Sequence, residues 1–140
     1  MNIDDVKVLQ AIRRRAADEA AQEVAQADAQ RADADHALAT FRTRLGDEVR
    51  RAQGLGLSPV LATWYRAAAK RLHELEIFAI ERADQASTAR ESLRFAAIEA
   101  ERIDTVSDQL EAQRRAEIAR QAQGDMDELA LGRRLLDPEA

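Results

Sequence analysis

The chain has 140 residues, of which 46% are hydrophobic but only 4% aromatic, with five Gly, two Pro and no Cys. Such a composition is typical of long helices and leaves few bulky side chains for a wide globular core. The formal net charge of −5 argues against a basic nucleic-acid interface, and the lack of Cys excludes disulfides and thiolate chemistry.

The beginning of the chain, MNIDDVKVLQ, lacks the basic start and apolar run of a signal peptide. No segment approaches the roughly 18 consecutive apolar residues that a membrane helix needs. We therefore expect a cytoplasmic protein without direct membrane insertion.

A first long helix is predicted over residues 3–53, because residues 1–45 contain no Gly or Pro. Its apolar positions recur at steps of three and four, which is the signal of a coiled-coil seam. The expected seam residues are Val6, Leu9, Ile12, Ala16, Ala20, Val24, Ala27, Arg31, Ala34, Leu38, Phe41, Leu45, Glu48 and Ala52. Two consecutive steps of four, from Ala16 to Ala20 to Val24, predict a stutter.

A tip is predicted over residues 54–58, within the stretch QGLGLSPVLATWYR. Gly54 and Gly56 supply a permissive backbone. Ser58 is expected to cap the next helix and Pro59 to occupy its first position, where the missing N–H costs nothing.

A second helix is predicted over residues 59–131, with Gly132 as its C-terminal cap and a flexible tail at 132–140. Its expected seam comprises Leu61, Tyr65, Ala68, Leu72, Leu75, Ala79, Arg82, Ala86, Ala89, Leu93, Ala96, Ala100, Ile103 and either Val106 or Ser107.

Folding the chain at the tip brings seam residues together in pairs whose numbers add to 112 or 113. The prediction is a single all-α domain, an antiparallel coiled-coil hairpin whose second helix is the longer one. Arg31 then lies opposite Arg82 in a polar layer, which we interpret as fixing the register or weakening the pairing locally. Both side chains are expected to point outward to acids such as Asp28, Asp35 or Glu81. The same register places Arg13 and Arg14 near Glu99 and Glu101.

Residues 111–131 have no predicted partner in the first helix, because the pairing ends where Ile3 meets Leu110. This segment nevertheless carries a stripe formed by Ile118, Ala122, Met126 and Leu129. An exposed apolar stripe on a lone helix predicts binding to a partner, with self-association or fraying of the helix as the alternatives.

The sequence contains no complete catalytic or ligand-binding motif. The GLG of the tip lacks the Gly-Lys-Ser/Thr of a phosphate loop, and His73-Glu74-Leu75-Glu76 lacks the second His of a zinc helix. His36 also lies in a long helix, and no Ser has an evident base beside it. We expect no enzyme activity, no catalytic residue, no cofactor and no metal.

Three short patterns resemble the FliJ/YscO (SctO) family of type III export stalk proteins. VKVLQAIRRRAADEA at 6–20 is similar to the opening of the injectisome YscO-like branch, which this resemblance favours over the flagellar branch without settling the choice. Gly56 followed by Tyr65, Ala68 and Leu72 is similar to a family pattern of Gly, Tyr, Phe and Leu, with Ala68 replacing the aromatic. MDELALGRR at 126–134 is similar to an acidic pair followed by a late Arg.

The resemblance implies a stalk that binds a hexameric export ATPase, contacts an export-gate protein at the inner membrane and assists the cycling of secretion chaperones. Its location would be cytoplasmic and peripheral to the inner-membrane export machinery. The implied ATPase-binding residues are Val6, Leu9, Arg13, Ile118, Met126 and Leu129, and the implied gate and tip-half residues are Leu38, Phe41, Leu45, Trp64, Tyr65, Leu72 and Leu75.

A second hypothesis is a coiled-coil holding chaperone or scaffold that is unrelated to secretion. In that case Trp64 and the apolar residues Leu57 and Val60 would contact clients at the tip. The sequence leaves open whether the chain is a monomer or a dimer.

Overall fold

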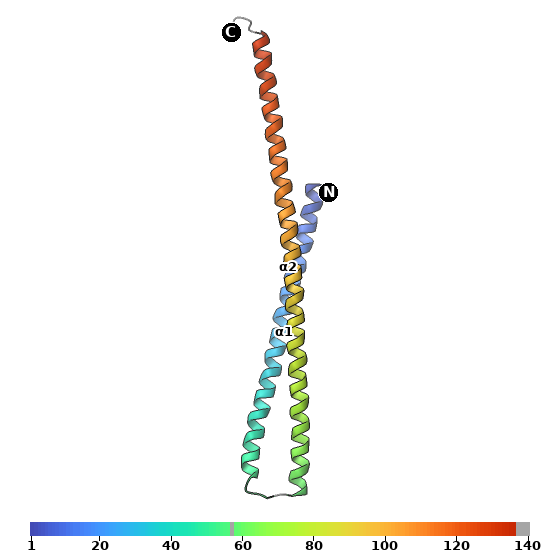
Figure 1. Ribbon diagram of the computed structural model, residues 1–140, viewed down its shortest axis with the longest axis vertical. Coiled ribbons are helices and arrows are strands. Elements are labelled where there is room, and N and C mark those ends of the chain that lie inside the picture. The colour runs from blue at the N-terminus through green and yellow to red at the C-terminus, as the bar shows by residue number, and fades with distance from the viewer. Residues whose placement is uncertain (57, 137–140) are drawn as a thin grey trace. The chain divides into compact units, whose positions relative to one another are not determined.

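The computed structural model describes residues 1–56 and 58–136 and is all-helical over these residues. Helix α1 runs from Ile3 to Ala52 and helix α2 from Pro59 to Leu136 (Figure 1). The two helices pack against each other and α2 is the longer one, which confirms the predicted fold class. Neither helix, as described, contains a segment apolar enough to span a bilayer.

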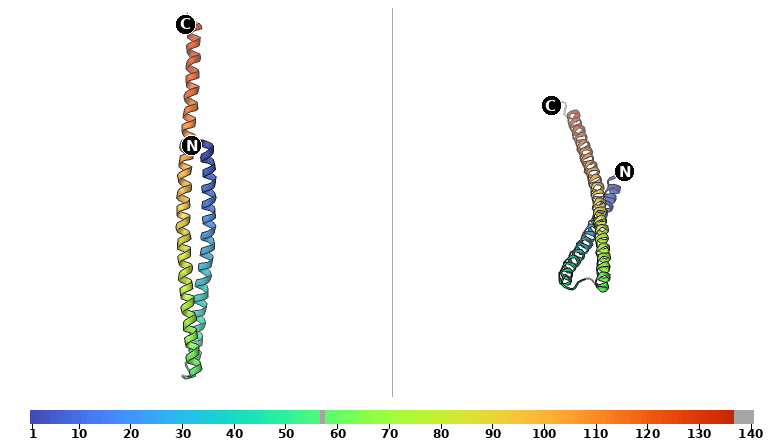
Figure 2. Two further views of the ribbon diagram at one scale, coloured as in Figure 1. Left: turned by 90° about the vertical axis from the view of Figure 1, so that its right-hand side faces the viewer. Right: turned by 60° about the horizontal axis from the view of Figure 1, so that its bottom comes forward.

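The contacts of the chain divide it into two compact units. One unit combines Met1–Arg15 with Ala97–Ala140, and the other comprises Ala16–Ala96. In each unit a segment of α1 lies beside an antiparallel segment of α2 (Figures 1 and 2).

Both helices begin at residues whose side chains cap them. The side-chain Oδ1 of Asn2 accepts a hydrogen bond from the backbone N–H of Asp5 at 2.9 Å. The Oγ of Ser58 accepts one from the N–H of Leu61 at 3.1 Å, and Pro59 is the first helical residue. The predicted restart of the helix at Ser58-Pro59 is therefore confirmed. Gly56 adopts a positive φ of 70°, which an L side chain would disfavour.

Small side chains form much of the seam in the unit of residues 16–96. Its most buried residues are Ala20, Ala34, Ala52, Leu75, Ala79 and Ala86. Ala34 and Ala79 satisfy the predicted pairing rule, and so do Gln30 and Arg82, whose side chains are joined by a 2.7 Å hydrogen bond from Nη1 to Oε1. The predicted register therefore agrees with this cross-helix bond.

The seam of the other unit passes through Val6 and Ser107. Val6 is only 1% exposed and Ser107 6%, whereas Val106 is 40% exposed. Of the two alternatives left open by the sequence, Ser107 is thus the seam residue. A groove beside the start of α1 is lined by Ile3 and Leu110, where the pairing was expected to end.

The first turns of the α1 seam differ from the prediction. Ile12 is 56% exposed and Ala16 is exposed, whereas Gln10 and Ala17 are half-buried. The side-chain amide of Gln10 donates a 2.5 Å hydrogen bond to Asp104 Oδ1 on α2, which satisfies both polar groups at this position. In these turns, the residues that lie in the seam are therefore determined by their three- and four-residue spacing along the helix and not by which neighbouring side chain is the most apolar.

The predicted stutter at Ala16–Val24 is consequently wrong. Steps of three and four continue without interruption through Ala17, Ala20 and Val24. Near the tip Glu48 is exposed and Val49 half-buried, so the two consecutive steps of four fall at Phe41, Leu45 and Val49 instead.

The polar layer contains two half-buried arginines that find separate acceptors. Arg31 pairs with Asp35 at 3.9 Å, as expected. Among the described residues, Arg82 donates to the amide oxygens of Gln30 and Gln85 and to no acid, and its guanidinium lies 4.9 Å from the centre of the Phe78 ring. Each arginine therefore has its own polar acceptor, which offsets the cost of placing two like charges in one layer.

The end of α2 also differs from the prediction. The helix continues through Gly132 to Leu136, so Gly132 is not a cap and residues 132–136 are not a tail. The remaining predicted tail, 137–140, and Leu57 lie outside the described residues.

Candidate functional site

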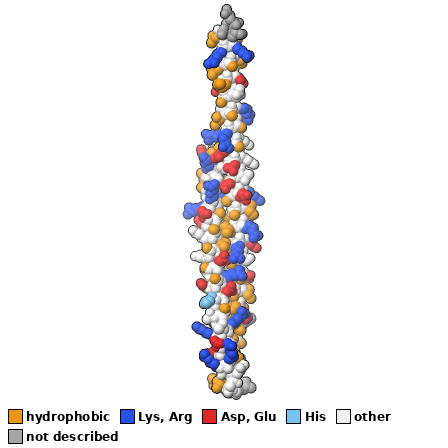
Figure 3. All heavy atoms as spheres, turned by 90° about the vertical axis from the view of Figure 1, so that its left-hand side faces the viewer, with side chains coloured by type: hydrophobic (Ala, Val, Ile, Leu, Met, Phe, Trp, Pro, Cys, Tyr) orange, Lys and Arg blue, Asp and Glu red, His pale blue; other side chains and the backbone are white. Residues whose placement is uncertain are grey.

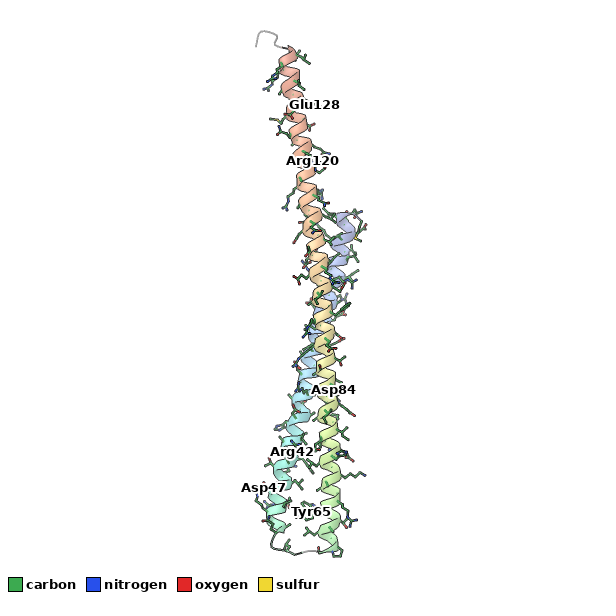
Figure 4. All side chains as sticks on the ribbon, in the orientation of Figure 1. Arg42, Asp47, Tyr65, Asp84, Arg120 and Glu128 are labelled. Atoms are coloured by element: carbon green, nitrogen blue, oxygen red, sulfur yellow. The ribbon has the colours of Figure 1, made fainter. Side chains whose placement is uncertain are left out.

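The most exposed part of α2 is its C-terminal segment, defined here as residues 111–136. Every residue from Ala112 to Leu131 is exposed. Arg120 and Glu128 lie in this segment (Figure 4). The start of α1 reaches only its first turns, where Ile3 and Asp4 line a groove together with Gln113 and Glu117. The predicted contact residues Ile118, Met126 and Leu129 are 56%, 65% and 65% exposed.

Helix geometry gathers these side chains on one face. At about 100° per residue, five positions fall within about 80° of one another. They are Ile118, Ala122, Met126, Leu129 and Leu136. Leu131 and Leu135 lie on the opposite side of the same helix and are 59% and 82% exposed. The segment therefore has an apolar stripe along one face and, on its opposite side, two further exposed leucines near its end.

Sequence reasoning missed the last three leucines of this surface. Leu131, Leu135 and Leu136 are all strongly exposed. Because the helix was expected to end before Gly132, Leu135 and Leu136 were not counted among its exposed apolar residues. The signal that could have retained them is the recurrence of Leu at positions 129 and 136, seven residues apart and on one helix face.

The remaining residues of the predicted ATPase-binding group are less accessible. Val6 is buried and Leu9 half-buried, whereas Arg13 is exposed. A partner could not reach Val6 while α1 and α2 stay packed. The neighbouring Arg14 pairs with Asp104 of α2 at 3.4 Å.

The predicted gate-binding residues lie mainly in the seam. Leu75 is only 9% exposed, and the others are half-buried, namely Leu38, Phe41, Leu45, Trp64, Tyr65 and Leu72. Of these residues, Phe41 and Leu75 line a groove together with His36, Ala37, Thr40, Arg44 and Arg71. A partner would therefore contact the exposed edges of these residues and the surrounding charged side chains.

The tip carries a separate apolar groove. Its cavity volume is about 370 Å³, and it is lined by Glu48, Arg51, Ala52, Leu55, Ser58, Val60, Leu61 and Trp64. Leu55 and Val60 are 78% and 80% exposed. The Trp64 and Tyr65 rings meet edge to face with centroids 5.0 Å apart, so each orders the other. Leu57, which was expected to join this surface, lies outside the described residues.

Charge is mixed along the chain, as Figure 3 shows for one face. Cross-helix ion pairs join Arg42 to Glu76 at 3.2 Å and Arg90 to Asp28 at 2.8 Å, and all four side chains are partly exposed. Within the described residues, no group of three or more His, Cys, Asp or Glu side chains is arranged to hold a metal ion. The geometry therefore favours apolar grooves and stripes as the candidate contact sites.

Comparison with models of known protein families gives no match, and comparisons with curated protein sequences and with solved structures also give none.

Proposed function

We propose that the protein is the stalk of a type III protein export apparatus and binds the hexameric export ATPase through the C-terminal segment of α2. The observation that carries this proposal is the exposure of Ile118, Met126 and Leu129 on one face of a helix that α1 does not cover. Burying such side chains in a partner yields about 25 cal/mol per Å² of apolar area. An exposed helical stripe of this kind is suited to a groove between helices of another protein.

Close packing of the two helices within each unit is suited to a stalk. Buried alanines at seam positions allow the helices to approach closely. The resemblance to the FliJ/YscO family supports the injectisome branch and a location beside the inner-membrane export machinery. The edges of Leu38, Phe41 and Leu72 would contact the export-gate protein, and secretion chaperones would be further partners.

The stalk would act by binding some conformations of the ATPase ring more tightly than others. A protein that discriminates in this way shifts the populations of the ring conformations and alters nucleotide turnover. This mechanism requires no catalytic group on the stalk itself.

The direct test mixes the chain with the export ATPase of the same organism and measures hexamer formation and ATP hydrolysis. Full-length protein should promote both, and a version that lacks residues 111–140 should promote neither. The proposal fails if the full-length chain neither binds the ATPase nor changes its activity.

A second candidate function is a holding chaperone, and the tip groove is the observation that favours it. Leu55, Val60 and Trp64 present apolar surface around this groove. A chaperone of this kind would suppress aggregation of a heat-denatured model protein. Val60→Glu would abolish suppression, whereas the C-terminal segment would not be needed.

A further inference from the structure

A shallow groove runs along the last turns of α2. Its volume is about 530 Å³, and it is lined by Asp125, Glu128, Leu129, Gly132, Arg133 and Leu136. These residues form two overlapping sets with the spacing i, i+3, i+4 and i+7, which is the arrangement that receives one knob of a facing helix in a coiled coil. A Cβ added at Gly132 would meet nothing within 4 Å, so its position is open.

The side chains around this groove complement a second copy of the same segment. If two copies run antiparallel with Leu129 opposite Leu129 of the second copy, Met126 lies opposite Gly132 and Ala122 opposite Leu136. Met126 and Leu136 are 65% and 87% exposed, and each would face a small residue. Large side chains opposite small ones fill the space between helices at native density.

The same alignment also matches charge. It places Asp125 opposite Arg133 of the second copy, and the twofold symmetry repeats the pair. Neither residue forms an ion pair within the described part of the chain. A parallel alignment would instead place Asp125 opposite Asp125, so the charges favour the antiparallel arrangement.

We propose that two copies of the protein associate antiparallel through residues 122–136 of α2, around a twofold axis at Leu129. The contact is short, and we expect a dissociation constant of about 10 µM, typical of a small interface. The dimer covers Met126 and Leu129. Dimerisation would therefore prevent this stripe from binding the ATPase. This regulatory consequence rests on the proposed function, but the proposal of the dimer does not.

The dimer is tested on the purified full-length chain alone by analytical ultracentrifugation from about 1 to 200 µM. The unchanged protein should shift from monomer to dimer over this range. Leu129→Glu should weaken association at least about tenfold, because it places two like charges at the twofold axis. Leu131→Glu is the matched control, since it adds the same charge to an exposed leucine on the opposite face, and it should dimerise as the unchanged chain does.

Charge exchange tests the direction of the helices. Asp125→Arg and Arg133→Asp should each weaken association about five- to tenfold, because each replaces two attractions with two repulsions. The double exchange should restore it. Since the chain has no Cys, mixing Met126→Cys with Gly132→Cys protein should also yield a mixed disulfide dimer under oxidation.

The proposal is overturned if the unchanged chain stays monomeric at about 200 µM, if Leu131→Glu weakens association as much as Leu129→Glu, or if the double exchange does not restore it. These readouts involve no ATPase, so they are independent of the outcome for the proposed function. Far-UV circular dichroism on each variant verifies that helix content is unchanged.

Discussion

Ala86 and Ala34 are almost completely buried, at 0% and 2% exposure. Alanine has the highest helix propensity and the smallest side chain that still contributes apolar area. At seam positions it allows the backbones of the two helices to approach closely. A larger side chain at these positions would therefore lower the stability of the packed helices.

Ala86→Leu should destabilise the unit of residues 16–96 by about 1–3 kcal/mol, because the added atoms have no space between the helices. Urea unfolding followed by circular dichroism measures the change. Ala69→Leu makes the same substitution at an exposed position of α2 and should change the free energy of unfolding by less than about 0.5 kcal/mol. Equal effects at the two sites would contradict the seam described here.

Ser58→Ala should destabilise the chain by about 1 kcal/mol, because the N–H of Leu61 loses the acceptor that caps α2. Ser87→Ala removes a hydroxyl from an exposed position in the helix interior and should be neutral or slightly stabilising. Thermal unfolding of both variants separates a cap from an ordinary serine. A Ser58→Ala protein that unfolds like the unchanged chain would remove the capping role.

At the scale of the helix, spacing decides which residues are buried. The tip, the two helices and the antiparallel register could be predicted because three- and four-residue steps, Gly and Pro act locally. The first turns of α1 were predicted wrongly because Ile12 is apolar and Gln10 is not. A hydrogen bond to Asp104, 94 residues away in sequence, makes Gln10 acceptable in the seam, and no local pattern contains that information.

The candidate site was predictable in part for the same reason. The stripe with Ile118, Met126 and Leu129 follows from spacing, and the structure leaves these residues exposed. The burial of Val6 and Leu75 follows equally from the seam, whereas their selection as partner contacts came from the resemblance to a known family. The helix end at Gly132 was misplaced because a glycine without a following proline lowers helix stability without ending the helix.

Val6→Ala should reduce the free energy of unfolding by about 1–2 kcal/mol, since two buried methyl groups are lost from the seam. Val8→Ala makes the same change two residues away, where the side chain is 60% exposed, and should have little effect. Hydrogen exchange of the surrounding amides reports the local change. The assignment of Val6 to the seam is wrong if both variants behave alike.

Ala34→Cys combined with Ala79→Cys should form a disulfide within one chain, because both alanines are buried and the predicted register places them opposite each other. The chain contributes no competing thiol. Ala32→Cys combined with Ala79→Cys is the control, since residue 32 is exposed and two positions away. Mass spectrometry of the monomer under mild oxidation distinguishes the two proteins, and an efficient crosslink in the control alone would require another register.

At the scale of the whole molecule, the chain combines a packed helical pair with a C-terminal segment that presents its apolar side chains to solvent. The packed pair accounts for folding, whereas the C-terminal segment buries little within the described chain and is available for association. Self-association and ATPase binding would use overlapping parts of this segment. Ile118 lies outside residues 122–136, so a substitution at Ile118 should affect ATPase binding without affecting self-association.

The measurement that tests the central claim most directly is the affinity of the Ile118→Glu protein for the export ATPase of the same organism, determined by biolayer interferometry. Ala116→Glu is the matched control, because it adds the same charge to an exposed position about 160° away on the same helix. We expect Ile118→Glu to weaken binding at least about tenfold and Ala116→Glu to leave it unchanged. Unaltered binding by the Ile118→Glu protein, or equal losses in both variants, would contradict the assignment of this stripe as the ATPase-binding surface.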